Sequence, residues 1–180
     1  MPRTRPVLVW DSGPLIALAA AAEVFPRILR LPAEFVLPEA VHREVVVEGL
    51  RRGAPEASIV ERSIREGPLS VRAPQAGGRA LLARLRENPR LSEADATALA
   101  LAAEIGGRLV ADERDLRKAV RISGVEVGGS LYLLLWAVEE GVLTAEEASG
   151  AVDRMLERGW YCSSTVLKAF LDTLGPRGKG

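Results

Sequence analysis

Short apolar runs that alternate with helical segments place the strongest limit on how this chain can fold. The first run, VLVW at 7–10, is apolar throughout, which indicates a buried strand rather than an amphipathic one. Further strands are predicted over 34–37, 69–72 (an edge strand), 108–111 and 125–127. Strands that alternate with helices favour a parallel sheet covered by helices. We therefore expect an α/β fold, a three-layer α/β/α sandwich around a central, mostly parallel sheet.

The segments between the strands carry recognisable helix ends. Pro14 suits the first turn of a helix, Ser92 opens the most clearly marked helix, Gly106-Gly107 ends it, and Thr144 to Glu147 form a capping box. Helices are expected over 12–22, 24–31, 38–52, 55–66, 79–86, 92–105, 113–121, 131–139, from 144 onward, and over 163–174, with a loop over 74–78. The sequence predicts one domain over 1–174 and a loose tail over 175–180.

Composition narrows the chemistry that the chain can support. Of its 180 residues, 24 are Lys or Arg and 24 are Asp or Glu, so the zero net charge neither supports nor excludes a nucleic-acid partner. The single cysteine, Cys162, and the single histidine, His42, make the common zinc sites untenable. Any metal would be held by oxygen ligands, which favours Mg²⁺ or Mn²⁺. Without a signal peptide or a membrane-length apolar stretch, we expect a cytoplasmic protein with no membrane association.

Two acidic residues directly follow predicted strands. Asp11 ends the segment VLVWD and Asp112 ends the segment RLVAD. Because the carboxyl ends of parallel strands meet at one edge of a sheet, we expect the two carboxylates to lie side by side there. Glu44, one to two turns into the helix after the second strand, and Asp95, in the first turn of the helix that Ser92 opens, complete a cluster of four. Four close carboxylates repel one another and raise one another's pKa values, a penalty that a divalent cation removes. Such a site suits phosphodiester hydrolysis.

Each acid also has a purely structural interpretation. For Asp11 and for Asp112, a cap on the helix that follows is as good an explanation as a site residue. Asp95 belongs to a capping-box pattern with Ser92, and Glu44 could be a solvated acid on a helix face. The functional interpretation rests on the order and placement of all four acids together. Around them we expect a supporting shell of polar residues, namely Ser12, Ser130, Glu93 and Asp115.

A basic stripe follows Asp112. Its members fall at i, i+3, i+4 and i+7, which is one helix face, and are Arg114, Arg117, Lys118 and Arg121. Beside a carboxylate cluster, such a stripe would bind the phosphates of an incoming RNA strand. The alternative, of equal weight, is a solvated face whose charges pair with Glu113 or Asp115.

Four segments, in order, resemble the PIN-domain family and most closely its prokaryotic VapC-type toxin-like ribonucleases. They are VLVWDSGPLIALA, FVLPEAVHREV, LSEADATALALAAEIGGRLVADERDLRKAV and VEVGGSLYLLL. The resemblance implies a PIN-like fold and Mg²⁺- or Mn²⁺-dependent cleavage of single-stranded RNA, together with a homodimer and a cognate antitoxin protein. It assigns the metal site to four acids, with Ser12 and Ser130 at the family's polar site positions and Arg117 at its arginine; the acids are Asp11, Glu44, Asp95 and Asp112.

The chain also departs from this branch. Ser92 stands where the branch has Gly, Asp95 where it has Glu, and Glu113 where it has a second Asp, while Trp10 is bulky beside the first acid. These departures motivate an alternative: a non-catalytic PIN-like module that binds RNA or a protein. A receiver-like phosphoacceptor domain ranks last. It would need paired acids after the first strand and a lone Lys after the last, which this chain does not have.

Overall fold

The computed structural model describes residues 5–175, and its centre is one parallel sheet of five strands. The order β3-β2-β1-β4-β5 puts β1 in the middle, and every neighbouring pair is parallel. The strands are β1 (Val7–Trp10), β2 (Glu34–Pro38), β3 (Leu69–Arg72), β4 (Arg108–Val110) and β5 (Val127–Gly128). The predicted α/β class and parallel sheet are confirmed.

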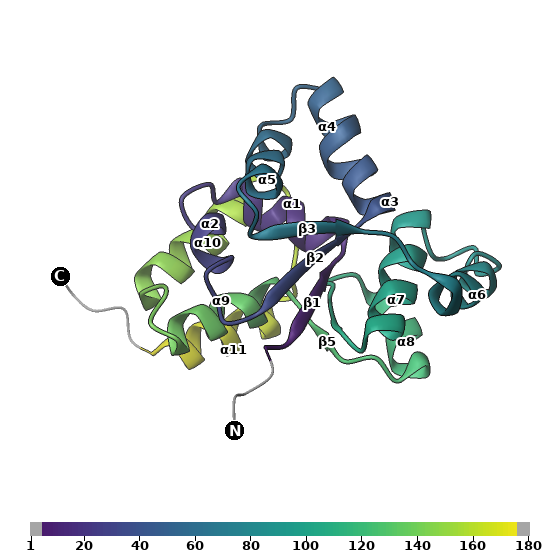
Figure 1. Cartoon of the computed structure of the whole chain (residues 1–180). Helices are drawn as coiled ribbons and strands as arrows, with labels where there is room; N and C mark the ends of the chain where they lie inside the picture. Colours follow the sequence, from purple (N-terminus) through teal and green to yellow (C-terminus); the bar gives the residue numbers. More distant parts are fainter. Residues whose placement is uncertain (1–4, 176–180) are drawn as a thin grey trace.

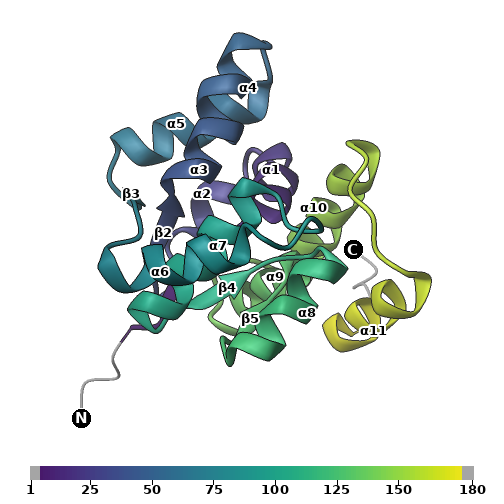
Figure 2. The same ribbon diagram turned by 90° about the vertical axis from the view of Figure 1, so that its right-hand side faces the viewer.

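Helices cover both faces of the sheet, which completes the three layers (Figures 1 and 2). The face drawn to the right of the sheet in Figure 1 carries α6 (Ala76–Leu85), α7 (Glu93–Ile105) and α8 (Arg114–Ser123). The other face carries α1 (Ser12–Ala20), α2 (Phe25–Ile28), α5 (Pro55–Arg65), α9 (Ser130–Glu139) and α10 (Ala145–Glu157). The last helix, α11 (Ser164–Leu174), packs against α9. None of the helices within 5–175 is both long and apolar enough to cross a membrane.

The central strand explains the uninterrupted apolar run at the start of the chain. Leu8, Val9 and Trp10 are fully buried because helices pack on both faces of β1. Trp10 lies against the rings of Phe25 and Phe35, with centroid distances of 5.9 and 6.2 Å. The run can therefore bury its large side chains on one face and Val9 on the other, and it carries the chain straight to Asp11 at the sheet edge.

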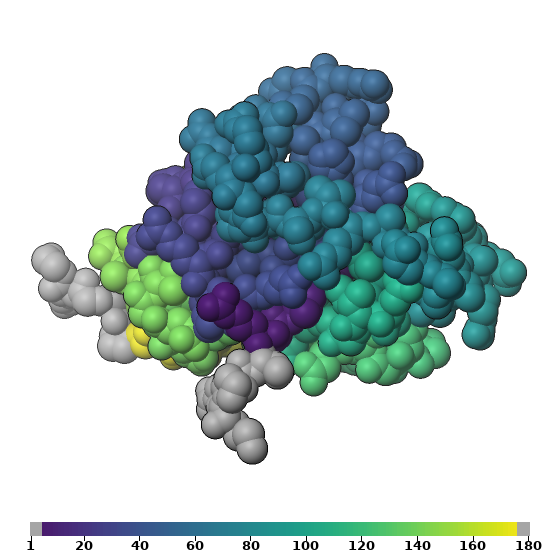
Figure 3. Space-filling model, in the orientation of Figure 1, coloured from purple at the N-terminus to yellow at the C-terminus, as the bar shows by residue number. Residues whose placement is uncertain are grey.

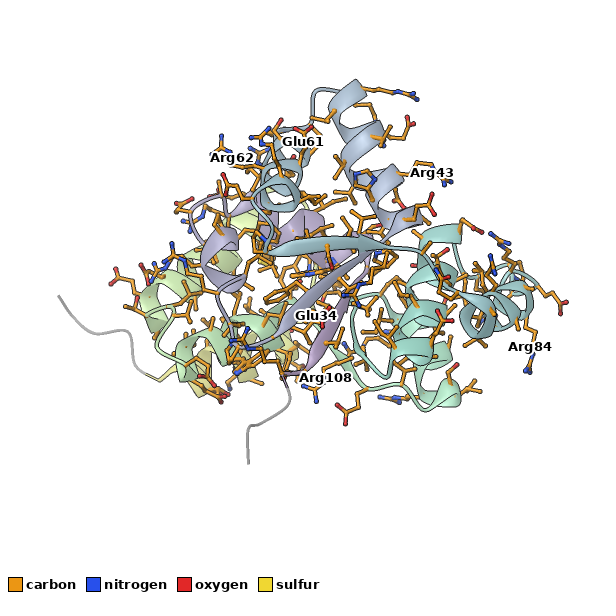
Figure 4. All side chains as sticks on the ribbon, viewed as in Figure 1. Glu34, Arg43, Glu61, Arg62, Arg84 and Arg108 are labelled. Atoms are coloured by element: carbon orange, nitrogen blue, oxygen red, sulfur yellow. The ribbon has the colours of Figure 1, made fainter. Side chains whose placement is uncertain are left out.

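One long helix leads away from the sheet after β2. It consists of α3 (Glu39–His42), a π-helical stretch (Arg43–Val47) and α4 (Glu48–Arg51), and it projects at the top of Figures 1 and 3. α5 packs closely beside it. The approach is so close that a Cβ on Gly49 would lie 2.8 Å from the Cβ of Ala57. Arg43 lies on this projecting helix (Figure 4). Sequence patterns predicted the helix over 38–52 but not its π-helical centre.

Some predicted boundaries are wrong. The last strand is Val127–Gly128, rather than 125–127, and the loop predicted over 74–78 already contains the first turn of α6. Glu104 provides the reason, because its carboxylate accepts hydrogen bonds from the backbone amides of Gln75 (2.8 Å) and Gly78 (2.9 Å). These bonds satisfy free N–H groups at the start of the helix. The loose tail predicted over 175–180 lies, from 176 on, outside the described residues.

The two edges of the sheet differ in chemistry. Glu34 begins β2 and Arg108 begins β4, so both lie at the amino edge (Figure 4). There Arg108 pairs with Glu126, and its guanidinium lies 5.0 Å from the centre of the Tyr132 ring. At the opposite edge the chain places Asp11 after β1 and Asp112 after β4, as the sequence predicted.

Candidate active site

Asp11 is the most buried acid at the carboxyl edge of the sheet. Its backbone N–H donates to the carbonyl of Val110 (3.0 Å), which fixes it between β1 and β4, and the residue is only 4% exposed. Asp11 occupies the N-cap position of α1, yet its side chain makes no capping hydrogen bond. Its Oδ1 is buried and has no hydrogen-bond partner among the described residues. A role as a helix cap does not explain why this buried oxygen lacks a partner. A binding site for a positive ion would explain it.

Two neighbouring acids act on Asp11. Burial raises the pKa of Asp11 from 3.8 to about 7; the negative charges of Asp95 and Glu44 act in the same direction, and the Ser12 amide opposes them. Asp95 contributes further by accepting a hydrogen bond from the protonated form. The structure therefore brings three of the four predicted acids into electrostatic contact, with Asp11 at the centre.

Asp95 forms the capping box considered from sequence and also lies close enough to Asp11 to act on it. Its carboxylate accepts a hydrogen bond from the Ser92 amide (2.7 Å), and its own amide donates to Ser92 Oγ (3.0 Å), which completes a capping box at the start of α7. The same side chain raises the pKa of Asp11. The cap thus holds Asp95 at the sheet edge and does not remove it from the cluster.

Glu44 reaches the cluster from the π-helical stretch. Ser12 Oγ donates a 3.0 Å hydrogen bond to Glu44 Oε2, which links the residue after Asp11 to the projecting helix. A π-helical turn holds one more residue than an α-helical turn, so it changes the direction of the side chains beyond it, and such turns are frequent at functional sites. The predicted place of Ser12 beside the acids agrees with this contact.

Asp112 is held by a separate set of donors. Ser130 donates to it twice, from its amide to Oδ1 (2.8 Å) and from its hydroxyl to Oδ2 (2.5 Å). Trp160 Nε1 donates a third bond to Oδ2 (2.8 Å). The alternative role as a helix cap is not realised, because Glu113 is the N-cap of α8 and accepts from the Leu116 amide. Asp112 is therefore an oriented carboxylate beside the cluster.

Several residues at the site were not predicted. Gly129 lies against Asp112, since a Cβ there would be 2.5 Å from Oδ1, and the segment from Trp160 to Cys162 closes the site from the C-terminal side. Burial raises the pKa of the Cys162 thiol, and the charge of Asp112 raises it further. One signal was available: Trp160 and Tyr161 are adjacent aromatics in a chain that is only 4% aromatic.

A divalent cation fits these residues by chemistry rather than by present geometry. The donors are carboxylate oxygens, which hard cations prefer, and the buried Asp11 Oδ1 is unpartnered within 5–175. In that part of the chain, however, no group of three or more His, Cys, Asp or Glu side chains is arranged to hold a metal ion. A cation shared by Asp11, Asp95 and Glu44 would thus require at least one of them to change rotamer.

Asp11 and Asp112 open into one cleft of about 720 Å³. Arg114 and Arg117 line it beside the acids, and its other wall is largely aromatic and aliphatic, formed by Leu131, Tyr132, Trp160, Tyr161 and Val166. Arg117 also donates to the backbone carbonyl of Ala111 (2.8 Å), which holds its guanidinium close to Asp112. The cleft combines negative, positive and aromatic surfaces.

The remaining predicted residues lie away from this cleft. Glu93 pairs with Arg86, and Asp115 pairs with Lys118 (3.4 Å). Asp115 and Lys118 line a different hollow between α6 and α8, and Arg121 is exposed on α8. The basic stripe is therefore divided: Arg114 and Arg117 face the carboxylates, whereas Lys118 faces away from them.

Comparison with known families agrees with this architecture. A family model described as a PIN domain matches residues 7–176 of the chain. A search of curated proteins found no match to the chain. The matched range includes all four carboxylates, both serines and the segment around Trp160.

Proposed function

Because the chain belongs to the PIN-domain family, whose members are generally nucleases, we propose that it is a metal-dependent endoribonuclease that cuts single-stranded RNA. The observation that supports this most is the state of Asp11. A carboxylate that is buried, unpartnered at Oδ1 among the described residues and close to two further acids is unstable in its charged form unless a cation binds. The adjoining cleft, with two arginines, suits a polyanion.

In this proposal the side chains at the site have different roles. Asp11, Asp95 and Glu44 would hold Mg²⁺ or Mn²⁺, and Ser12 would orient Glu44 through its 3.0 Å hydrogen bond. Ser130 and Trp160 orient Asp112 at the border between the acids and the cleft. When bound, the cation supplies an activated water and neutralises charge on the phosphate. Arg114 and Arg117 would bind neighbouring phosphates of the strand.

Cleavage of a labelled, unstructured RNA oligonucleotide tests this proposal. We expect products with Mg²⁺ or Mn²⁺, none with EDTA, and none from Asp11→Asn. Asp115→Asn is the matched control, because Asp115 is an acid on α8 outside the cleft, and it should cut at the wild-type rate. Cleavage that survives chelation, or full activity in Asp11→Asn, contradicts the proposal.

Metal binding can be measured without catalysis. A ligand present at 100 times its Kd stabilises a folded protein by about 2.7 kcal/mol. Thermal unfolding should therefore shift upward with Mn²⁺ in the wild type and in Asp115→Asn, but not in Asp11→Asn or Asp95→Asn. Equal shifts in all four chains would place the cation elsewhere.

A second candidate, a PIN-like module that binds RNA or protein without cutting, has one observation in its favour. Within 5–175 the acids are not arranged to share a metal ion, and three hydrogen bonds already engage the oxygens of Asp112. RNA binding that is insensitive to EDTA and yields no products would support this candidate against the nuclease.

We also propose that the nuclease forms a homodimer. Its proposed biological role is that of a VapC-type toxin in the cytoplasm, with an antitoxin protein as its partner. These proposals rest on the resemblance of the four sequence segments. Light scattering of the purified chain tests the dimer. A small upstream reading frame whose product binds this chain and blocks its cleavage of RNA would support the toxin role.

A further inference from the structure

The link between α10 and α11 forms one wall of the cleft. It has no regular secondary structure from Trp160 to Ser163, and the exposure of its side chains alternates. Trp160 and Cys162 are partly buried beside Asp112. Trp160 donates to Asp112 Oδ2, and the pKa of the Cys162 thiol is raised by burial and, to a smaller extent, by the charge of Asp112. Between them Tyr161 is 80% exposed and lines the same cleft.

This exposure is unusual for the size of the side chain. The other tyrosine, Tyr132, is half-buried and accepts a hydrogen bond from Arg108, and all three tryptophans are buried or partly buried. Tyr161 makes no ring contact or hydrogen bond with the described residues that would hold it for structural reasons. The hydrogen bond of Trp160 to Asp112 anchors the neighbouring residue, so the Tyr161 ring lies on the wall of the cleft that Asp11 and Asp112 also line.

From this arrangement we propose that Tyr161 is a stacking platform for one unpaired base of the RNA, next to the bond that is cut; the inference rests on the proposed nuclease function. The cleft has partners for both kinds of group that a single strand exposes, its phosphates and its bases. Arg114 and Arg117 suit its phosphates, and an exposed ring suits a base face. A base inside a duplex has no free face to offer, so the site selects unpaired RNA.

The two arginines of the cleft, rather than its charge as a whole, favour RNA over a peptide as the occupant of this wall, since Asp11, Asp112 and Glu113 line the same cleft. Arg114 and Arg117 have no ion-pair partner within the described part of the chain, so their charge is available to phosphates. Val166, which is 50% exposed, extends the apolar wall beside Tyr161. It serves as an internal control, because it contributes apolar area without an aromatic face.

Binding in the Asp11→Asn chain tests the inference without cleavage. The ligand is a short unstructured RNA in which one position carries fluorescent 2-aminopurine, moved along the strand in a series. Stacking on an aromatic side chain is worth about 5-fold to about 150-fold in affinity per base. We expect this loss from Tyr161→Ala, and a change within about twofold from Tyr161→Phe and from Val166→Ala. Because no phosphate contact is lost, the salt dependence of binding should not change.

The fluorescence provides a second readout. At one position of the series, binding should alter the 2-aminopurine signal with Tyr161 or Phe at this site, and the Ala variant should abolish the change. Because Tyr161 is exposed, its variants should fold as the wild type does, and their unfolding temperatures would verify this. Unchanged affinity and unchanged fluorescence in Tyr161→Ala overturn the inference and leave a protein partner as the occupant of this wall.

The outcomes separate this inference from the proposed function. Metal-dependent cleavage with RNA binding that ignores Tyr161 overturns the platform and keeps the nuclease. Binding that depends on Tyr161, in a wild-type chain that never cuts RNA with Mg²⁺ or Mn²⁺, supports the platform and overturns the nuclease.

Discussion

Trp160 Nε1 donates a 2.8 Å hydrogen bond to Oδ2 of Asp112, and so joins two residues that are 48 positions apart in the chain. Asp112 follows β4, whereas Trp160 follows α10 on the other face of the sheet. The C-terminal helices therefore do more than cover the core. They carry a donor to the carboxyl edge of the sheet and form one wall of the cleft there.

Replacing Trp160 by Phe should weaken catalysis more than RNA binding. The change keeps an aromatic ring and removes the donor to a charged acceptor, a bond worth about 1.5–3 kcal/mol. We expect kcat to fall about tenfold or more, with the Kd for RNA within about twofold, because Asp112 loses one of the three hydrogen bonds that orient it. Trp136→Phe is the matched control: Trp136 lies on α9 and its Nε1 donates to Glu140 at the end of that helix, and neither residue lines the cleft. Equal effects of the two changes would contradict a positioning role.

The raised pKa of Asp11 predicts how stability depends on pH without metal. The folded chain holds a proton on Asp11 up to about pH 7, whereas the unfolded chain releases it near 3.8. Between these values Asp11 binds more protons in the folded state, so its contribution to the free energy of unfolding should fall as pH rises from about 4 to about 7. The loss should amount to a few kcal/mol and be complete above pH 7.

Unfolding temperatures in EDTA across this range measure the effect. Asp11→Asn has no titrating group at position 11, so its stability relative to the wild type should rise between pH 4 and 7 and should exceed that of the wild type at pH 8. Stabilisation of the wild type by Mn²⁺ should grow through pH 7, because the cation binds the deprotonated carboxylate. A wild type that gains stability between pH 4 and 7, relative to Asp11→Asn, would show that Asp11 is not held in its neutral form.

The fold was predictable because its elements follow local rules. The uniformly apolar VLVW indicated a buried strand, and turn or cap residues marked most of the helices. The positions of Asp11 and Asp112 at one edge followed from the parallel sheet alone. The exceptions depend on distant partners: Glu104 starts α6 earlier than Gly77 and Gly78 suggest, by accepting hydrogen bonds from amides 26 and 29 residues away.

The details of the site were less predictable, because side-chain pairing depends on three-dimensional distances. Helical spacing put Arg114 and Lys118 on one face. In the structure Arg114 lines the cleft, whereas Lys118, one turn later, pairs with Asp115. Glu93, next to Ala94 and Asp95 in sequence, points to Arg86 instead of the acids. Trp160 could not be assigned to Asp112 at all, since nothing local connects residues 48 positions apart.

Gly129 predicts a sharp steric effect at the same acid. Its backbone is extended (φ −111°), so any residue could adopt it, but a Cβ would lie 2.5 Å from Asp112 Oδ1. Gly129→Ala should displace Asp112 and lower the cleavage rate at least tenfold. Gly13→Ala is the matched control, since its Cβ would be 3.8 Å from Asp11 Oδ2, an ordinary contact, and Ala favours the helix by up to about 1 kcal/mol. Loss of activity in both variants would point to general crowding of the cleft.

The division of the basic stripe predicts different salt dependences for two arginines on one helix. Arg114 lines the cleft, whereas Arg121 is exposed on α8 and is not among the residues that line it. Each phosphate contact with single-stranded nucleic acid contributes about −0.7 to the slope of log K against log salt. Arg114→Gln should make the slope shallower by about this amount, while Arg121→Gln should leave it unchanged. The two variants remove the same charge from the same helix, so a general loss of positive potential would affect both alike. Equal changes in slope would mean that RNA follows the whole stripe and extends beyond the cleft.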